Sequence, residues 1–303
     1  MYAARAGLKP LLFEGMLANG VAAGGQLTTT TDIENYLGFA EGVNGLELTE
    51  TFAKQSKRFG TEIRPQTVTR VDLSARPFRL WTEGNEEAAA PDARAAALIV
   101  ATGASPRRLP AAGAEAYWQK GVSTCATCDG FFFKNKAVAV VGGGDSACEE
   151  ALYLSKLCTR VFLVHRRDTL RASVIMADRV RAHPKIECVW DAAVKEVRGD
   201  GKKVSSLLLA DATGAGRPDR ELAVAGVFVA IGHTPATEWL GGQLQTDADG
   251  YLVVDRANAT SVEGVWAAGD VADRKYRQAI IAAGNGAVAA LEAERWLTMK
   301  GGE

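Results

Sequence analysis

Two cysteines three positions apart are the residues whose chemistry stands out in this sequence. Cys125 and Cys128 lie in the run Val122-Ser-Thr-Cys-Ala-Thr-Cys-Asp-Gly130, so Asp129 directly follows the second cysteine. A C-x-x-C pair can be half of a metal site, a structural disulfide, or a redox pair that opens and closes. The rest of the sequence must decide among these three hypotheses.

The other cysteines and the histidines argue against a metal site. A zinc site built on one C-x-x-C needs a second such pair, or a histidine pair at similar spacing. The remaining candidates are scattered instead: Cys148, Cys158, Cys188, His165, His183 and His233. We therefore expect no metal, and we expect the three other cysteines to be small buried side chains. An odd total of five cysteines also disfavours a disulfide framework.

Composition indicates a globular protein with about two domains. The chain has 303 residues, 47% of them hydrophobic, and domains usually have ~150 residues. Its 35 Lys and Arg nearly balance 36 Asp and Glu, so no strong field attracts nucleic acid or an anionic membrane. No apolar run approaches the ~18 residues of a membrane span, and the first residues lack a secretory signal pattern. We expect no nucleic-acid or membrane partner and a reducing compartment, the cytoplasm by default; the sequence does not distinguish it from an organelle.

Residues 137–167 have the pattern of a β-α-β unit. The sequence predicts a short buried strand over 137–141, a tight loop over 142–147, a helix over 148–157 and a second strand over 161–164.

The loop of this unit fits the phosphate-binding pattern G-x-G-x-x-A. Gly142 permits the turn, Gly144 lets the backbone approach a pyrophosphate, and Ala147 packs the helix on the strand. The helix N-terminus then faces the phosphates. The pattern alone is weak evidence, but here it stands between a strand and a helix, which is the context a dinucleotide site requires.

The end of the second strand predicts which coenzyme binds. A site for NAD usually has an acid there, about 20 residues past the glycines, to hold the ribose 2′-hydroxyl. This chain has His165, Arg166 and Arg167, with Arg171 one turn onward. Guanidinium groups can bind a 2′-phosphate bidentately, which favours NADPH over NADH. The alternative is a solvated basic cluster with no ligand.

A second nucleotide-binding unit is indicated at the N-terminus. The apolar run 10–14 ends in Glu14, as the second strand of a β-α-β unit ends in its ribose-binding acid. The glycine loop of that unit would lie ~20 residues earlier, before Met1. We therefore expect the first strand and loop of this unit to be absent, and its nucleotide to bind weakly.

Two further strands are predicted to end in glycine, over 97–103 and 264–270. The second of them places Asp270 beyond the carboxyl end of a strand, where ligands bind in parallel sheets. An alanine-rich helix is expected over 277–297, and its start could face an anionic or electron-rich ring.

At this point the sequence resembles one family, the low-molecular-weight, NADPH-dependent thioredoxin reductases of the bacterial, fungal and plant type, apparently truncated at its N-terminus. The resemblance covers essentially the whole chain, and six motifs stand in the order of that family. They are Gly24-Gly-Gln-Leu-Thr-Thr-Thr-Thr-Asp-Ile-Glu-Asn35, Cys125-Ala-Thr-Cys-Asp-Gly130, Gly142-Gly-Gly-Asp-Ser-Ala147, His165-Arg-Arg167, Gly269-Asp-Val271 and Arg277-Gln-Ala279.

The resemblance implies an α/β fold with two Rossmann-like nucleotide-binding domains, one inserted into the other. The FAD-binding domain would comprise residues 1–107 and 240–303, without its first strand and glycine loop. The NADPH-binding domain, residues 108–239, would carry the C-x-x-C. Stretches rich in proline and glycine at 104–121 and 233–242 are the expected joins.

The resemblance also implies a function for the cysteine pair. Electrons would pass from NADPH through FAD to a disulfide between Cys125 and Cys128, and then to thioredoxin by thiol exchange. Cys128 would lie over the flavin, Cys125 would attack thioredoxin, and Asp129 would transfer the proton. A homodimer is implied as well.

The remaining implied contacts fall into two sets. The FAD contacts would be Glu14, Gly15, Gln26, Leu27, Asn35, Ala101, Thr102, Gly103, Gly269, Asp270, Arg277, Gln278 and Ala279. The NADPH contacts would be Gly142, Gly144, Asp145, Ser146, His165, Arg166, Arg167, Arg171 and Gly232.

Two alternatives remain open from the sequence. One is a related NAD(P)H-dependent flavin disulfide reductase that serves another disulfide carrier. The other is a nucleotide-binding module whose catalysis is impaired by the missing loop. A visible flavin spectrum distinguishes the second from an active flavoprotein.

Overall fold

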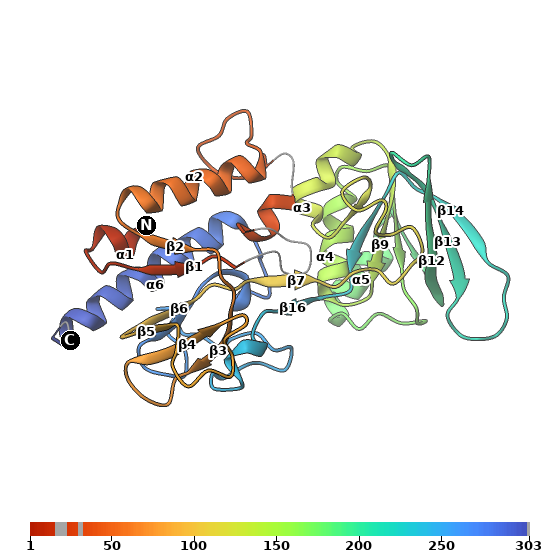
Figure 1. Cartoon of the computed structure of the whole chain (residues 1–303). Coiled ribbons are helices and arrows are strands. Elements are labelled where there is room, and N and C mark those ends of the chain that lie inside the picture. The colour runs from red at the N-terminus through yellow and green to blue at the C-terminus, as the bar shows by residue number, and fades with distance from the viewer. Residues whose placement is uncertain (16–22, 30–32, 302–303) are drawn as a thin grey trace. The chain divides into compact units, whose positions relative to one another are not determined.

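The computed structural model describes residues 1–15, 23–29 and 33–301. The chain forms two compact units, Met1–Ser105 with Thr234–Glu303, and Pro106–His233. It passes from one unit to the other through β7 (Ala104–Pro106) and returns through β16 (His233–Pro235), and these two strands pair with each other (Figure 1). In the Gly24–Asn35 motif, residues 30–32 lie outside the described part of the chain.

The unit Pro106–His233 is built on a five-stranded parallel sheet. The strand order is β11 (Ile186–Val189), β10 (Arg160–Val164), β9 (Ala137–Gly142), β15 (Gly226–Ala230) and β8 (Val122–Ser123). Taken in chain order, β9, β10, β11 and β15 have the arrangement 3-2-1-4 of a Rossmann-like sheet. The expected α/β class and the two expected strands of the β-α-β unit are confirmed.

Both faces of this sheet are buried, which explains why its strands are continuously apolar. Ala139 and Val141 on β9 face a core shared with the antiparallel sheet β12 (Ala192–Gly199), β13 (Val204–Asp211) and β14 (Arg220–Ala223). Val138 and Val140 face the opposite core, which contains Ala147, Cys148, Ala151 and Leu154 of α4 (Asp145–Leu154) and Val180 of α5 (Val174–Ala182).

Helix α4 begins three residues earlier than the sequence pattern suggested. We expected it over 148–157, whereas it runs from Asp145 to Leu154. Gly144 is its N-cap, and Asp145 places an acid in the first turn, where the positive end of the helix dipole favours it. The G-x-G-x-x-A motif extends to Ala147, and its last three residues form the first turn of the helix instead of the loop.

The other unit contains three small sheets among its described residues. β1 (Leu11–Phe13) pairs in parallel with β2 (Glu62–Arg64), and β6 (Leu98–Val100) pairs in parallel with β17 (Val265–Ala267). The third sheet is antiparallel: β3 (Val68–Asp72), β4 (Phe78–Thr82) and β5 (Ala93–Ala95). One hydrophobic core of this unit contains side chains of β3, β4, β6 and β17.

The helices of this unit are α1 (Tyr2–Arg5), α2 (Gly45–Arg58) and α6 (Ala279–Met299), with short 3-10 turns η1 (Gly25–Thr29), η3 (Glu238–Leu240) and η4 (Gly269–Val271). Asn44 caps α2 by accepting a hydrogen bond from the Leu46 amide at 2.9 Å, as expected of an N-cap asparagine. Helix α6 packs on β6 and β17 through Ala289 and Ala293, where alanine allows close approach. None of the helices in the described ranges is long and apolar enough to cross a membrane.

Candidate active site

Cys125 and Cys128 form a disulfide at the start of a single helical turn, α3 (Ala126–Asp129). Their sulfur atoms are 2.03 Å apart and their Cα atoms 5.3 Å apart. Cys125 is the N-cap of α3, and its Sγ accepts a hydrogen bond from the Cys128 amide at 3.2 Å. Residues three apart on a helical turn lie on one face, so this spacing lets the sulfurs meet. Both cysteines are half-buried, so the disulfide is neither sealed in a core nor fully exposed.

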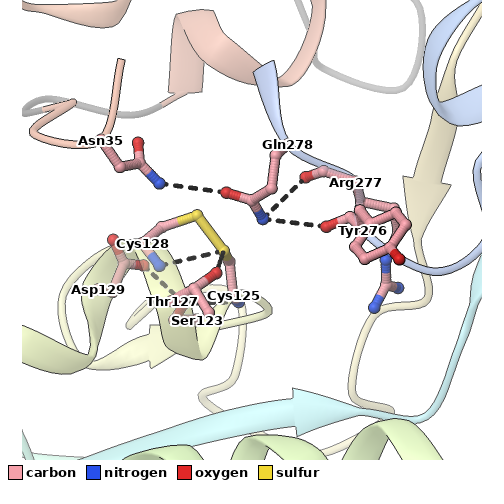
Figure 2. Close-up of a disulfide and its surroundings, with 9 residues drawn as sticks. All are labelled: Asn35, Ser123, Cys125, Thr127, Cys128, Asp129, Tyr276, Arg277 and Gln278. Carbon is pink, nitrogen blue, oxygen red and sulfur yellow. Dashed lines mark hydrogen bonds between the residues drawn. A yellow bond between two sulfur atoms is a disulfide. The ribbon is translucent and has the colours of Figure 1, made fainter. Parts of the chain in front are cut away.

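Asp129 lies beside this disulfide and is held by Ser123. The Ser123 hydroxyl donates to Oδ2 of Asp129 at 2.6 Å, and Ser123 Oγ accepts a hydrogen bond from the Cys125 amide at 3.1 Å (Figure 2). Burial raises the pKa of the Asp129 carboxyl above its ordinary value, and the Ser123 hydrogen bond opposes that rise. A carboxyl with a raised pKa can give and take protons closer to neutral pH.

The other three cysteines are free thiols. Cys148 and Cys158 are buried at 0% and 1% exposure, and Cys188 is half-buried. Burial raises the pKa of Cys148 and of Cys158 to about 11, so both remain protonated and unreactive at neutral pH. In the ranges that the structure describes, no group of three or more histidine, cysteine and acidic side chains could hold a metal ion.

The glycine loop leaves room for a phosphate at the start of α4. A Cβ atom on Gly142 would lie 2.4 Å from the Ala230 carbonyl oxygen, because β9 and β15 lie side by side there. In contrast, a Cβ on Gly144 would meet nothing within 4 Å, so the surface above the helix N-terminus is open. Asp145 is turned to one side, where its Oδ1 accepts hydrogen bonds from the amide and hydroxyl of Ser173. The loop therefore fits a pyrophosphate.

Arg166, Arg167 and Arg171 lie on the surface just beyond the end of β10. The amide of Arg171 donates to the Gly143 carbonyl at 2.7 Å, so the segment that carries these arginines crosses the glycine loop. The structure thus brings the exposed guanidinium groups and the predicted phosphate loop to one edge of the sheet. Gly232 follows β15 at that edge, since Ala230 pairs with Gly142.

His165 differs from its arginine neighbours because its side chain is buried. It is 5% exposed, and within the described part of the chain its Nε2 atom has no hydrogen-bond partner. Burial lowers the pKa of His165, and the positive charges of Arg171 and Arg167 lower it further, while backbone hydrogen bonds partly oppose the shift. The ring is therefore neutral and lies under the loop, whereas the sequence placed it with the arginines.

The predicted flavin residues lie mostly at the carboxyl ends of the parallel strands in the other unit. Glu14 and Gly15 follow β1, residues 101–103 follow β6, and Asp270 follows β17. This is the edge at which parallel sheets bind their ligands. The Thr102 side chain is held in place there, because its hydroxyl donates a hydrogen bond to the Ala236 carbonyl at 2.7 Å.

The start of α6 holds the second group of predicted flavin residues. Gln278 is the N-cap of α6, Ala279 is its first residue, and Arg277 has a positive φ of 50°. Asn35 donates through Nδ2 to Oε1 of Gln278 at 3.2 Å, which links the start of α6 to the Gly24–Asn35 motif (Figure 2). Gln26 and Leu27 of that motif lie in η1.

Asp270 has the most perturbed carboxyl of this group. Burial raises the pKa of Asp270 to about 6, the nearby Asp273 carboxylate adds to the rise, and Arg277 opposes it. A half-buried carboxyl that faces a ligand-binding edge can hydrogen-bond to sugar hydroxyls.

Ser123 is a site residue that no pattern in the sequence predicts. It precedes Cys125 by two positions and Asp129 by six. No known motif marks such a serine, and only the turn from β8 into α3 brings its hydroxyl to Asp129. Ser173 was not predicted either, because only the fold brings it to the Asp145 carboxylate at the start of α4.

Comparison with known proteins agrees with this geometry. The family model described as pyridine nucleotide-disulphide oxidoreductase matches residues 1–286. The chain is 52% identical to thioredoxin reductase 1 of Saccharomyces cerevisiae over 301 residues, which cover 98% of this chain and 93% of the yeast protein.

Solved structures give the same result. A thioredoxin reductase from Giardia duodenalis superposes with a TM-score of 0.90 at 44% identity, covering 98% of this chain and 94% of the Giardia chain. A thioredoxin reductase from Streptococcus pyogenes superposes with a TM-score of 0.86 at 37% identity, covering 98% and 93%. The resemblance inferred from the motifs is confirmed: the chain belongs to the pyridine nucleotide-disulphide oxidoreductases and, within that family, to the thioredoxin reductases.

Proposed function

We propose that this thioredoxin reductase uses NADPH and FAD, and that each unit of the fold binds one of them. The unit Pro106–His233 binds NADPH at the glycine loop, and the unit formed by Met1–Ser105 and Thr234–Glu303 binds FAD. When bound, NADPH supplies a hydride and FAD passes two electrons on to a disulfide. The observation that carries the proposal is the half-exposed Cys125–Cys128 disulfide with the Asp129 carboxyl beside it.

The two cysteines have different roles in this proposal. Two electrons and two protons convert the disulfide into a dithiol. Cys125 is the attacking residue, because its sulfur already accepts a hydrogen bond from the Cys128 amide, and such a bond stabilises a thiolate. Cys128 is the sulfur that receives electrons from the flavin side. This assignment follows the resemblance, and the amide bond to Cys125 supports it.

Asp129 moves the protons that thiol exchange requires. The Cys125 thiol loses its proton to solvent, and the resulting thiolate attacks one sulfur of the thioredoxin disulfide, which forms a mixed disulfide and releases a thioredoxin thiolate. Protonated Asp129 gives its proton to that thiolate, and the resulting carboxylate takes the proton of the Cys128 thiol. The Cys128 thiolate then attacks Cys125 Sγ, which closes the Cys125–Cys128 disulfide and releases the second thioredoxin sulfur as a thiolate, protonated by solvent.

The NADPH contacts in this proposal fall into three functional groups. Gly142, Gly144 and the first turn of α4, with Asp145 and Ser146, hold the pyrophosphate. Arg166, Arg167 and Arg171 hold the 2′-phosphate through charge-assisted hydrogen bonds. The buried His165 ring packs against the glycine loop at Gly143. Gly232, which follows β15, has no side chain that would fill the space beside the loop.

FAD would lie along the strand ends of the other unit. Glu14 and Asp270 are placed to accept hydrogen bonds from ribose and ribityl hydroxyls, as acids at strand ends do in nucleotide sites. The amides at the start of α6 would stabilise electron-rich ring oxygens of a bound flavin. The remaining contacts are Gly15, Gln26, Leu27, Asn35, Ala101, Thr102, Gly103, Gly269, Arg277, Gln278 and Ala279.

The partner is thioredoxin, and the assembly is a homodimer. Thioredoxin follows from membership of the family, and the homodimer from the family resemblance. We place the enzyme in the cytoplasm, since the three free cysteines fit a reducing compartment. Light scattering of the purified enzyme tests the dimer, because a mass near the 32.1 kDa of one chain would contradict it.

Turnover of thioredoxin with NADPH and added FAD tests the proposal. Cys125→Ser and Cys128→Ser should each abolish thioredoxin reduction while NADPH still bleaches the flavin absorbance. Cys188→Ser, which removes a half-buried free thiol, is the matched control and should retain activity. Thioredoxin turnover in either of the first two variants would overturn the assignment of the disulfide.

A further inference from the structure

Ser123 connects the disulfide helix to the Asp129 carboxyl through a single hydroxyl. It ends β8 and is only 4% exposed. Its Oγ accepts the Cys125 amide hydrogen at 3.1 Å and donates to Asp129 Oδ2 at 2.6 Å (Figure 2). These two bonds tie the first residue of the C-x-x-C to the acid that follows its last residue.

The direction of these bonds is fixed by chemistry. An amide can only donate, so Ser123 Oγ must accept from Cys125, and its one hydroxyl hydrogen is left for Asp129. Asp129 Oδ2 thereby accepts one hydrogen bond already, which makes Oδ1 the better oxygen to carry an exchangeable proton. A hydroxyl held from both sides restricts the rotamer of the carboxyl, and its bond to Oδ2 favours the carboxylate over the protonated form.

We propose that Ser123 is the positioning residue for Asp129, and that it sets the orientation and the working pH range of this proton-transfer group. The proposal rests on the proton-transfer role proposed for Asp129. Ser123 itself exchanges no proton with substrate. It acts by holding Oδ2, so that Oδ1 is presented to the sulfur that must gain or lose a proton.

Within the described ranges, Ser123 is the side chain that hydrogen-bonds to the Asp129 carboxyl and lowers its pKa. The elements packed most closely against α3 in the described part of the chain are η2 (Gly130–Phe133), which has no titratable side chain, and α4. The titratable side chains of α4 are Asp145, Cys148, Glu149, Glu150 and Tyr153. Burial raises the pKa of Asp129, the Ser123 hydrogen bond opposes the rise, and no charge in the described part of the chain adds to either effect. In the dithiol state, the Cys125 and Cys128 thiols become the titratable groups nearest in sequence.

The pH profile of thioredoxin reduction tests the proposal. Asp129→Asn first identifies the limb of the profile that belongs to Asp129, because that limb disappears in this variant. In Ser123→Ala the same limb should move to higher pH, since the bond that favours the carboxylate is lost. The rate constant for thioredoxin reduction should fall about tenfold, part of the ~10²–10⁴-fold that a positioned proton-transfer group contributes.

A buried serine elsewhere in the same unit provides the control. Ser206 is 6% exposed and donates to Glu221 Oε1 at 2.6 Å, which matches the Ser123–Asp129 bond. Ser206→Ala should leave both the limb and the rate constant unchanged. In addition, Ser123→Ala combined with Asp129→Asn should be no slower than Asp129→Asn alone, because Ser123 acts only through Asp129.

A second pair of variants covers the case in which Ser123→Ala does not fold. Threonine and valine are nearly equal in size and both suit a strand, but only threonine has a hydroxyl. Ser123→Thr and Ser123→Val therefore differ in the hydrogen bond alone. The limb should stay in place in Ser123→Thr and move to higher pH in Ser123→Val. An unmoved limb in the variants without the hydroxyl would overturn the role of Ser123 while leaving that of Asp129 intact. A limb that survives in Asp129→Asn would overturn both.

Discussion

Gly143 lies directly against the imidazole ring of His165. A Cβ atom on Gly143 would be 2.2 Å from Cε1 and 2.3 Å from Nδ1 of that ring, closer than real Cβ atoms approach other groups. The ring is buried, so moving it out of the way would break its packing against the loop. The middle glycine of the phosphate loop is thus required by the histidine beneath it, and the loop rests on a neutral imidazole.

Gly143→Ala should therefore destabilise the unit and weaken NADPH binding. Forcing one methyl group into a packed site typically costs about 1–3 kcal/mol. Thermal unfolding should show a lower Tm, and the KM for NADPH should rise.

Gly144→Ala is the matched control, because its Cβ would meet nothing within 4 Å, and it should keep the Tm of the wild type. Adding His165→Ala to Gly143→Ala should restore part of the lost stability. If Gly143→Ala has the Tm of the wild type, the His165 ring can move aside without loss of stability, which would contradict this account.

Charge at the end of β10 should determine coenzyme choice. Replacing Arg166 and Arg167 by Ala should raise the KM for NADPH by about tenfold or more and spare NADH, since a hydrogen bond to a charged group is worth about 1.5–3 kcal/mol. Steady-state kinetics with both coenzymes measures this. Arg181→Ala, an exposed arginine on α5, should change neither KM. Equal losses with both coenzymes would contradict the 2′-phosphate assignment.

Asp270 should make the flavin-free protein less stable as pH rises. The folded state raises the pKa of Asp270 to about 6 from 3.8, so between these values the folded state binds more protons than the unfolded state. Stability therefore falls as pH rises through this window, by at most about 2–3 kcal/mol. Asp270→Asn removes this cost. The unfolding free energy of the variant, relative to that of the wild type, should therefore increase from pH 4 to 6.5.

Denaturant unfolding at several pH values checks this prediction. Asp178→Asn, which changes an exposed carboxylate in the other unit, should follow the wild-type curve. A constant difference between Asp270→Asn and the wild type across the window would contradict the raised pKa.

Local patterns allowed much of this protein to be predicted. The strand, loop and helix over 137–167 follow from the residue pattern. Each strand there is buried on both faces and is therefore continuously apolar, which can be recognised without knowing the rest of the fold. The redox disulfide followed from the family resemblance, because the C-x-x-C spacing alone left three hypotheses open.

Contacts between distant segments could not be predicted in this way. The burial of His165 depends on the glycine loop that packs against it, more than twenty residues earlier in the chain. The Ser123–Asp129 bond is local, but no residue pattern encodes the turn that brings the two side chains together. The antiparallel sheet β12–β14 was not expected either, because it is an addition to the β-α-β pattern. Such features are set by tertiary packing, which residue spacing does not encode.

Thiol mapping during an anaerobic NADPH titration tests the central claim most directly. In the air-oxidised enzyme with added FAD, iodoacetamide should label neither Cys125 nor Cys128. After NADPH is added, mass spectrometry should find both labelled, with the labelling of Cys148, Cys158 and Cys188 unchanged. Adding oxidised thioredoxin should close the pair again. If Cys125 and Cys128 stay unlabelled while the enzyme reduces thioredoxin, or are free thiols before any NADPH is added, the disulfide does not carry the electrons.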